Sequence, residues 1–375
     1  MRMPQSGYTL CMKKTMRYMA LLALWVLVGA GARAEEMVVT ADGFRRAAQG
    51  PNGTVLLLEQ DVRLQDGIAV RVDALAALID KNSERVWETV LGGDGEDALY
   101  QAISLPQGGW MAAGLSGSAD LDNGWHEGWY SDMSAKTDGW AVRLSALGEV
   151  VWSRCFGGSD WDSLRGLCAA VDTGWVLAGE TYSSDGDVEG WHDSGALNVL
   201  PDGWLVCVNL DGDILWQRAL GGSGADTLQA ICALEDGYLA AGSSSSADGD
   251  VQSARAETDG WLVRLDARGE AVWSRCFGAD GRSSAFRALA AGPQGLWLAA
   301  GKQDADGWLV CVNAQGEALW EAAIPAEGDM AVDVLVWNDP VWTLAGRTLG
   351  TDETRTWVLS IQPQTGEWSV ISGAL

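Results

Sequence analysis

Short apolar runs alternate with glycine-containing turns along most of the chain. The clearest example runs from Asp259 to Gly278, where the apolar runs Trp261–Leu265 and Ala271–Phe277 flank the turn Asp266–Gly269. Runs of this length, rich in aromatic and β-branched residues and bounded by glycine, are typical of β-strands. Asp or Asn at the start of a turn, with Gly at its end, favours a hairpin whose last turn residue is left-handed. The pattern therefore predicts a β-hairpin here.

The same unit recurs along the chain. Each copy begins with two strands joined by a tight turn, followed by a loop. A third strand then begins with Asp-Gly-Trp or a divergent form of this motif, and a fourth strand ends the copy. The tryptophans of the last strands mark six units, at Trp87, Trp152, Trp216, Trp273, Trp320 and Trp368. Four short strands per unit describe one blade of a β-propeller. No segment after residue 34 sustains a 3.6-residue apolar period, which excludes a helical solenoid.

We therefore predict an all-β fold, a six-bladed β-propeller with four antiparallel strands per blade, as a single domain over residues 35–375. The expected blades cover residues 37–93, 94–158, 159–222, 223–279, 280–326 and 327–375. Every unit has its own fourth strand, so closing the ring requires no exchanged strand, although the segment Met37–Thr40 could reinforce the last blade.

The segment before the first blade has the features of a secretory signal peptide. Basic residues precede the apolar run Met19–Val28, and an A-x-A cleavage site ends at Ala34. The run is too short to span a bilayer, and no later run is longer. We expect residues 1–34 to be removed, with Met12 as a candidate true start. The mature protein is then secreted to the medium, the periplasm or the cell surface, without membrane insertion.

The charge of the chain bears on its partners, and its cysteine content bears on disulfide formation. The chain has 51 Asp+Glu against 25 Lys+Arg and a net charge of −26, and nucleic-acid binding needs a basic surface, so no nucleic-acid partner is expected. The even number of cysteines after the leader allows disulfides, but the absence of C-x-x-C pairs and the apolar surroundings favour buried thiols. They are Cys155, Cys168, Cys207, Cys232, Cys276 and Cys311.

The recurring motifs Gly-Gly-Ser-x-x-Asp and Asp-Gly-Trp-Leu-Val-x-Leu-Asp resemble the repeated units of β-propellers in bacterial secreted and cell-surface proteins. The resemblance covers nearly the whole chain after residue 34. The resemblance implies a protein that is exposed at the cell surface and binds a ligand, and it supplies no agreed catalytic residues. The piece from Asp266 through Gly269 to Trp273 is also distantly similar to the tryptophan-docking motif of quinoprotein-like propellers, including the outer-membrane assembly scaffold.

Long loops are expected on one face only. Because strand direction alternates within a blade, the corners between blades and the loops joining second to third strands emerge together, on what we call the loop face. Blades 2 to 4 carry the long loops there, at residues 116–137, 183–201 and 243–258. Loops held by a rigid scaffold are a common place for function.

Two sets of loop-face residues are candidates for binding. Aromatic rings stack on sugar faces, while imidazoles and acids hydrogen-bond to hydroxyls, although each ring could instead cap its own loop. The candidate ligand-binding residues are Trp125, His126, Trp129, Tyr130, Trp161, Trp191 and His192. Carboxylates at alternate positions are typical of calcium loops, although solvated acidic turns look the same. The candidate calcium ligands are Asp120, Asp122, Asp185, Asp187, Glu189, Asp248 and Asp250.

Three further acids, Asp97, Asp162 and Asp226, stand at the entrance to the first strands of blades 2 to 4. They could line the mouth of a channel, but side chains of this type more often accept hydrogen bonds from the local backbone, which is the interpretation we favour.

No catalytic motif such as G-x-S-x-G, H-E-x-x-H or a zinc-binding C-x-x-C pair occurs. We therefore expect a non-catalytic binding or scaffold protein for a glycan or a peptide or protein, with calcium as the candidate cofactor. The alternative is a glycan-active hydrolase or lyase that uses two carboxylates of the loop face.

Overall fold

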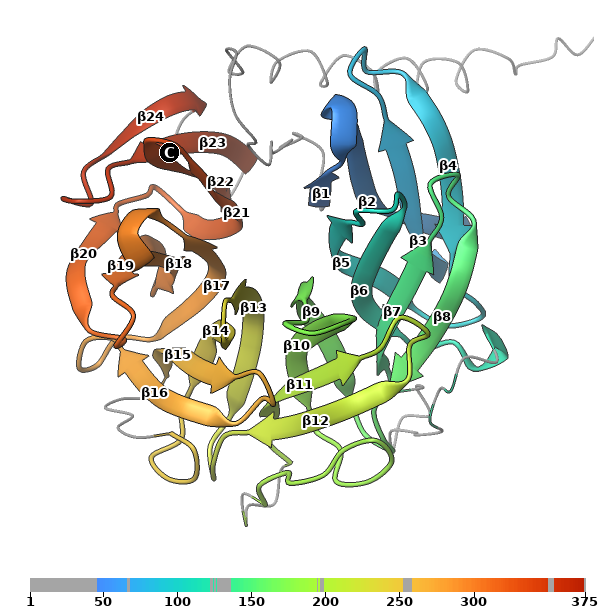
Figure 1. Ribbon diagram of the computed structural model, residues 1–375, viewed down its shortest axis with the longest axis horizontal. Helices are drawn as coiled ribbons and strands as arrows, with labels where there is room; N and C mark the ends of the chain where they lie inside the picture. The colour runs from blue at the N-terminus through green and yellow to red at the C-terminus, as the bar shows by residue number, and fades with distance from the viewer. Residues whose placement is uncertain are drawn as a thin grey trace, which may run out of the picture.

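The computed structural model describes residues 46–65, 68–121, 124, 126, 136–193, 195, 199–251, 258–349 and 354–373. These residues form six four-stranded antiparallel sheets arranged around a common axis (Figure 1). The prediction of a six-bladed β-propeller is confirmed. The expected signal peptide and the segment Met37–Thr40 lie outside the described residues. Within those residues, no helix has the length and apolar character needed to cross a membrane.

The strands follow one another in chain order within each blade, and the first strand lies nearest the axis (Figure 1). Blade 1 comprises β1 (Arg46–Gln49), β2 (Val55–Gln65), β3 (Ile68–Ile79) and β4 (Arg85–Leu91). Blade 2 comprises β5 (Asp97–Ser104), β6 (Trp110–Ser116), β7 (Asp138–Leu144) and β8 (Val150–Phe156). Blade 3 comprises β9 (Asp162–Ala169), β10 (Trp175–Thr181), β11 (Asp202–Val208) and β12 (Ile214–Leu220).

Blades 4 to 6 have the same order. Blade 4 comprises β13 (Asp226–Leu234), β14 (Gly237–Ser244), β15 (Asp259–Asp266) and β16 (Ala271–Phe277). Blade 5 comprises β17 (Ser284–Ala291), β18 (Trp297–Gln303), β19 (Asp306–Val312) and β20 (Ala318–Ile324). Blade 6 comprises β21 (Asp329–Asn338), β22 (Val341–Leu349), β23 (Thr354–Ile361) and β24 (Trp368–Gly373). No described strand is exchanged between sheets.

The hairpin turns form as their residue types require. Asp266 Oδ1 accepts hydrogen bonds from the backbone N–H groups of Arg268 (2.8 Å) and Glu270 (3.0 Å). Gly269 follows at φ +79°, a left-handed conformation that glycine adopts without strain. The predicted hairpin between the third and fourth strands is therefore confirmed for this blade.

The apolar core lies between consecutive blades. The cluster between blades 2 and 3, for example, joins Met111 and Phe156 of blade 2 to Leu177 and Trp204 of blade 3. Each of the third-strand tryptophans is buried, as expected for core residues: Trp140, Trp204, Trp261, Trp308 and Trp357. Packing between faces of neighbouring sheets, rather than within one sheet, holds the blades together.

The six described cysteines are thiols rather than disulfides, and five of them are buried. Burial raises the pKa of Cys207 to about 11 and that of Cys311 to about 12. Their thiolate forms are therefore scarce at neutral pH, and the thiols behave as small apolar side chains. The expectation of buried thiols is confirmed for five of the six, and Cys232 is partly exposed.

In blades 1 to 5, the tryptophan of the fourth strand packs on the hairpin turn of the next blade, whereas Trp368 of blade 6 donates to the carbonyl of Ala323 in blade 5. Trp87 Nε1 donates a hydrogen bond to the carbonyl of Ala146 at 3.0 Å, and Trp152 Nε1 donates to Leu210 at the same distance. The ring also needs a turn residue without a side chain: a Cβ added to Gly269 would lie 2.5 Å from the Trp216 ring. We call this arrangement the tryptophan–glycine contact.

Replacing Gly269 by Ala should destabilise the protein through this contact. The left-handed φ costs roughly 1–2 kcal/mol with any L side chain, and the clash with the Trp216 ring adds about 1–3 kcal/mol. Gly295→Ala is the matched control, since Gly295 has φ +77° and nothing within 4 Å of its added Cβ. Urea unfolding should show the larger loss for Gly269→Ala; equal losses would contradict the ring contact.

Candidate loop-face site

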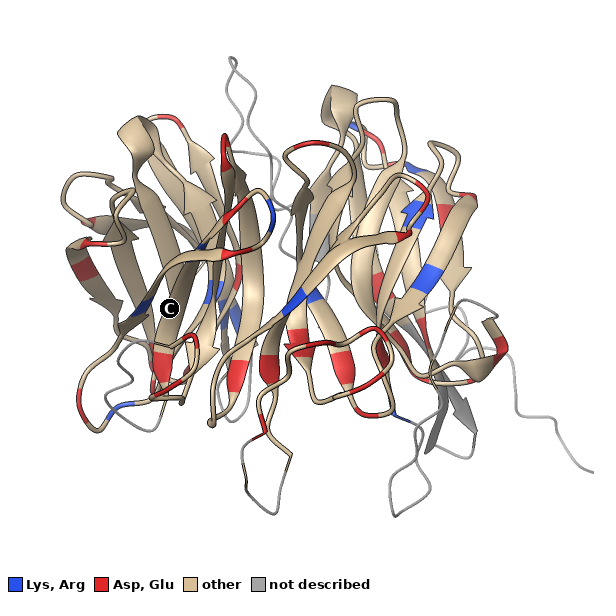
Figure 2. Ribbon diagram, turned by 60° about the horizontal axis from the view of Figure 1, so that its bottom comes forward, with Lys and Arg blue, Asp and Glu red and all other residues tan. Residues whose placement is uncertain are grey.

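Acidic residues gather on the loop face. Figure 2 shows Asp and Glu at the lower ends of several strands and in the loops below them. Corners and loops of blades 2 to 4 are joined by short hydrogen bonds. In blade 2, the backbone N–H of Gly95 donates to Ser118 Oγ at 2.8 Å, and that of Asp94 donates to Asp120 Oδ1 at the same distance. The corner and the loop therefore form one structural unit.

A buried aspartate holds each of these corners. In blade 3, Asp162 Oδ2 accepts from the backbone N–H of Gly158 (2.9 Å) and from Ser183 Oγ (2.8 Å), and Ser183 Oγ in turn accepts from the N–H of Asp160 (2.9 Å). We call this arrangement the corner network. It recurs in blade 2 around Asp97, Gly93 and Ser118, and in blade 4 around Asp226, Gly222 and Ser246. The interpretation of these aspartates as acceptors for the corner backbone is confirmed.

A second buried aspartate, from the preceding blade, lies against the same corner. A Cβ on Gly157 would lie 2.3 Å from Asp162 Oδ2 and 3.1 Å from Asp138 Oδ1. Both aspartates are at most 1% exposed, so two carboxyl groups from adjacent blades lie on either side of one glycine. The same arrangement surrounds Gly92, with Asp97 and Asp73, and Gly221, with Asp226 and Asp202.

Burial shifts the protonation of these acids. It raises the pKa of Asp162 to about 7, although Ser183 and the N–H of Gly158 favour the ionised form. Burial, with a smaller contribution from the neighbouring Asp226, raises the pKa of Asp202 to about 6. Burial also raises the pKa of Asp97, Asp138 and Asp226. Some of these carboxyl groups therefore remain protonated at mildly acidic pH.

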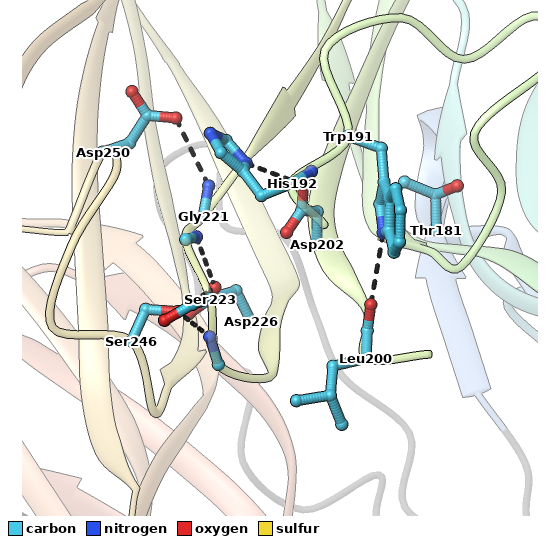
Figure 3. A network of polar contacts seen from close by, with 12 residues as sticks. Thr181, Trp191, His192, Leu200, Asp202, Gly221, Ser223, Asp226, Ser246 and Asp250 are labelled. Atoms are coloured by element: carbon cyan, nitrogen blue, oxygen red, sulfur yellow. Dashed lines mark hydrogen bonds and ion pairs between the residues drawn. The ribbon is translucent and has the colours of Figure 1, made fainter. Parts of the chain in front are cut away.

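Both histidines bind the second aspartate of a corner. His192 contacts Asp202 Oδ2 through its backbone N–H (2.8 Å) and its Nδ1 (2.9 Å) (Figure 3). His126 makes the same two contacts with Asp138 Oδ2, at 2.7 Å and 3.0 Å. The side-chain bond to Asp138 raises the pKa of His126. The sequence indicated the histidines but not these partners; the signal was the Asp that opens each Asp-Gly-Trp strand.

Two candidate tryptophans are described, and both are half-buried. Trp191 Nε1 donates to the carbonyl of Leu200 at 3.2 Å (Figure 3), and its ring packs against the core between blades 2 and 3. Trp161 immediately precedes the corner aspartate of blade 3 and donates its backbone N–H to Asp160 Oδ1 at 3.0 Å. Both rings lie at the base of the loops. Trp125, Trp129, Tyr130 and Asp122 lie outside the described residues.

The described calcium candidates bind the corner backbone. Asp185 and Asp248 each accept a backbone N–H at 2.7 Å, from Ser159 and Ser223 respectively. Asp187 accepts from Gly157 at 3.3 Å, and Asp250 accepts in the same way from Gly221 (Figure 3). Glu189 and Asp120 are exposed. Among the residues that the structure describes, no group of three or more His, Cys, Asp or Glu side chains is arranged to hold a metal ion.

No family model and no curated relative matches the chain. Among solved structures, it is similar to Sqt1 from Chaetomium thermophilum (14% identity, 86% of this chain, 68% of that one, TM-score 0.43). It is also similar to the β-propeller domain of the Trilobed protease from Pyrococcus furiosus (8%, 88% and 86%, TM-score 0.43). A third is the acylaminoacyl peptidase of Pyrococcus horikoshii (10%, 87% and 51%, TM-score 0.43), of which this chain spans about half. Likeness at this level carries no argument about function.

The free energy of unfolding should fall as the pH rises from 5 to 8. Asp162 has a pKa of about 7 in the folded protein and an ordinary value of 3.8, so the folded state binds more protons between these values. The stabilisation is complete below pH 3.8 and is lost as the pH rises through 7. In Asp162→Asn the slope of this free energy against pH should be shallower, by at most ~1.4 kcal/mol per pH unit.

Urea titrations at half-unit pH steps would measure both slopes. Asp185→Asn is the control, because the N–H of Ser159 lowers the pKa of Asp185; its contribution is present above pH 3.8 and is lost only at lower pH. That variant should keep the wild-type slope between pH 5 and 8. An unchanged slope in Asp162→Asn would show that Asp162 does not hold a proton in this range.

Proposed function

We propose that this protein is an exported, non-catalytic binding or scaffold propeller whose loop face over blades 2 to 4 holds a glycan or a peptide segment of a protein. The observation that carries the proposal is the corner network, which recurs in blades 2, 3 and 4. These are the blades whose sequences carry the long loops. Rigid bases beneath long loops reduce the ordering cost of binding.

The side chains at the base of these loops suit such a ligand. His126 and His192 are 30% and 33% exposed, and each is held in one orientation by its aspartate. Trp191 directly precedes His192 in sequence, Trp161 stands at the corner of blade 3, and both remain partly exposed. Fixed imidazoles next to aromatic surface supply the hydrogen bonds and the stacking that a sugar or peptide needs.

The burial of the carboxyl groups with raised pKa gives less support to the alternative, a glycan-active hydrolase or lyase. A general acid must come within hydrogen-bond distance of the glycosidic oxygen. The carboxyl groups whose pKa rises to about 7 and about 6, Asp162 and Asp202, are 1% exposed and lie beneath the corner backbone. The His–Asp pair also occurs twice at equivalent positions, as a repeated structural part does.

Glycan and peptide arrays probed with the purified protein test the proposal. Replacing Trp125, Trp129, Trp161 and Trp191 together by Ala should reduce binding at least about tenfold, because each ring supplies stacking area. Leu147→Ala is the control, since Leu147 is 72% exposed in a turn on the opposite face. Incubation with the bound polysaccharides should release no product. Binding that survives the four replacements, or product release, would reject the proposal.

Calcium is the proposed aid to this binding. Asp185 accepts hydrogen bonds from the backbone and the side chain of Ser159, and Asp248 accepts the same two from Ser223. A carboxylate offers about four acceptor positions, so the remaining positions can coordinate a cation. Calcium at 1 mM should raise the melting temperature, and Asp185→Asn with Asp248→Asn should abolish the rise. Magnesium at the same concentration is the control for ionic strength. A melting temperature that calcium leaves unchanged would remove it from the proposal.

A further inference from the structure

The innermost strands of blades 2 to 6 share a β-bulge. In β5 the pairing with β6 skips from Leu99 to Gln101, and the other four inner strands skip one residue at the equivalent position. A bulged residue is left out of the ladder, and its side chain is re-aimed. The bulged residues are Tyr100, Arg165, Gln229, Arg287 and Asp333. These strands surround the axis (Figure 1), so the five bulged positions lie on the innermost strands of the ring.

Four of these side chains form two contacts across blade boundaries. The guanidinium carbon of Arg165 lies 4.6 Å from the centre of the Tyr100 ring, and Arg287 donates from Nη1 to Gln229 Oε1 at 2.8 Å. We call these four residues, from blades 2 to 5, the inner arc. Asp333, the bulged residue of blade 6, contacts its own blade instead: Arg347 of β22 donates to both of its oxygens at 2.8 Å.

The inner arc has more positive than negative charge. Arg165 reaches one carboxylate, Glu180, at 3.4 Å, and Glu180 Oε1 also accepts from Ser163 Oγ at 3.1 Å. Arg165 Nε is buried and has no hydrogen-bond partner among the described residues. Arg287 forms no ion pair with a described carboxylate, and its nearest polar partner is the neutral Gln229. A buried donor without an acceptor is costly, and this applies to Arg165 Nε.

The two arginines also act on each other. Burial lowers the pKa of Arg287, and the positive charge of Arg165 lowers it further. The Arg287 side chain is nevertheless solvent-exposed, so solutes can reach it. Glu180 and Asp329 both attract Arg287, but Asp329 also pairs with Lys302 at 3.2 Å. Three cationic side chains therefore share two carboxylates, which favours the entry of an anion beside the arginines.

We propose that the inner arc binds an oxyanion, the carboxylate or phosphate group of a small ligand, between Arg165 and Arg287. Planar guanidinium groups bind such groups with two parallel hydrogen bonds. The Gln229 amide can donate a further bond, and the Tyr100 ring holds Arg165 in place. This site is distinct from the loop-face site, with which it shares no residue.

Isothermal titration of the full chain with sodium glucuronate, inorganic phosphate and glucose tests the site. At least one of the two anions should bind, and glucose should not. Binding of glucuronate alone identifies a carboxylate ligand, and binding of phosphate alone identifies a phosphate ligand. If neither anion binds at up to 20 mM, or if glucose binds as well as glucuronate, the proposal is wrong.

Charge-removing variants locate the binding. Arg287→Gln should weaken it at least about tenfold, and Arg165→Gln should do the same. Arg218→Gln is the matched control, because Arg218 lies on the outer strand β12 and pairs with Glu270. Circular dichroism should show that the variants fold. The melting temperature of the wild-type protein, but not that of Arg287→Gln, should rise when the binding anion is added; a purely structural Arg287 would leave both responses to the anion equal. Unchanged affinity in both arc variants would place the anion elsewhere and overturn the assignment.

Discussion

The tryptophan–glycine contact fixes how blades 1 to 5 each pack on the next, and the rest of the ring depends on it. Trp152 donates to the turn of blade 3, and Trp320 donates to that of blade 6 through Pro363. Loss of a fully buried ring costs about 3–5 kcal/mol; these half-buried rings contribute less than that, against a total stability of about 5–15 kcal/mol for a domain. Such contacts together therefore account for much of the margin by which the ring is stable.

The loop face uses the same device with polar groups. There, glycines such as Gly157 and Gly221 allow two carboxyl groups from adjacent blades to approach one corner. Serine hydroxyls and backbone N–H groups donate hydrogen bonds to these carboxyl groups, which offsets the cost of burying them. Their raised pKa also keeps a fraction of them protonated and therefore uncharged. The fold thus sets the protonation of its corners, and it does so at the base of the loops that are proposed to bind ligand.

The blades could be predicted from sequence because their signals are local. Asp266, Gly269 and the apolar runs beside them specify a hairpin within a few residues. The partner of His192 could not be predicted, because Asp202 lies ten residues further along the chain and no local pattern indicates how the loop between them folds. The same holds for the Asp138–Asp162 pair, whose members come from different blades. Burial likewise had to come from the structure, which placed Trp191 against the core.

The inner arc was missed for a different reason. A bulge is a property of two paired strands, so the position of Arg287 in β17 shows nothing unusual until the pairing with β18 is known. Within this one chain, the positions that build corners and turns repeat the same residue types, because packing leaves little choice there. The bulged positions face no partner strand, and they hold Tyr100, Arg165, Gln229, Arg287 and Asp333 in successive blades. In a repeat fold, positions that packing does not constrain can hold a different side chain in each repeat. In this ring, two of these positions hold arginine and one holds aspartate.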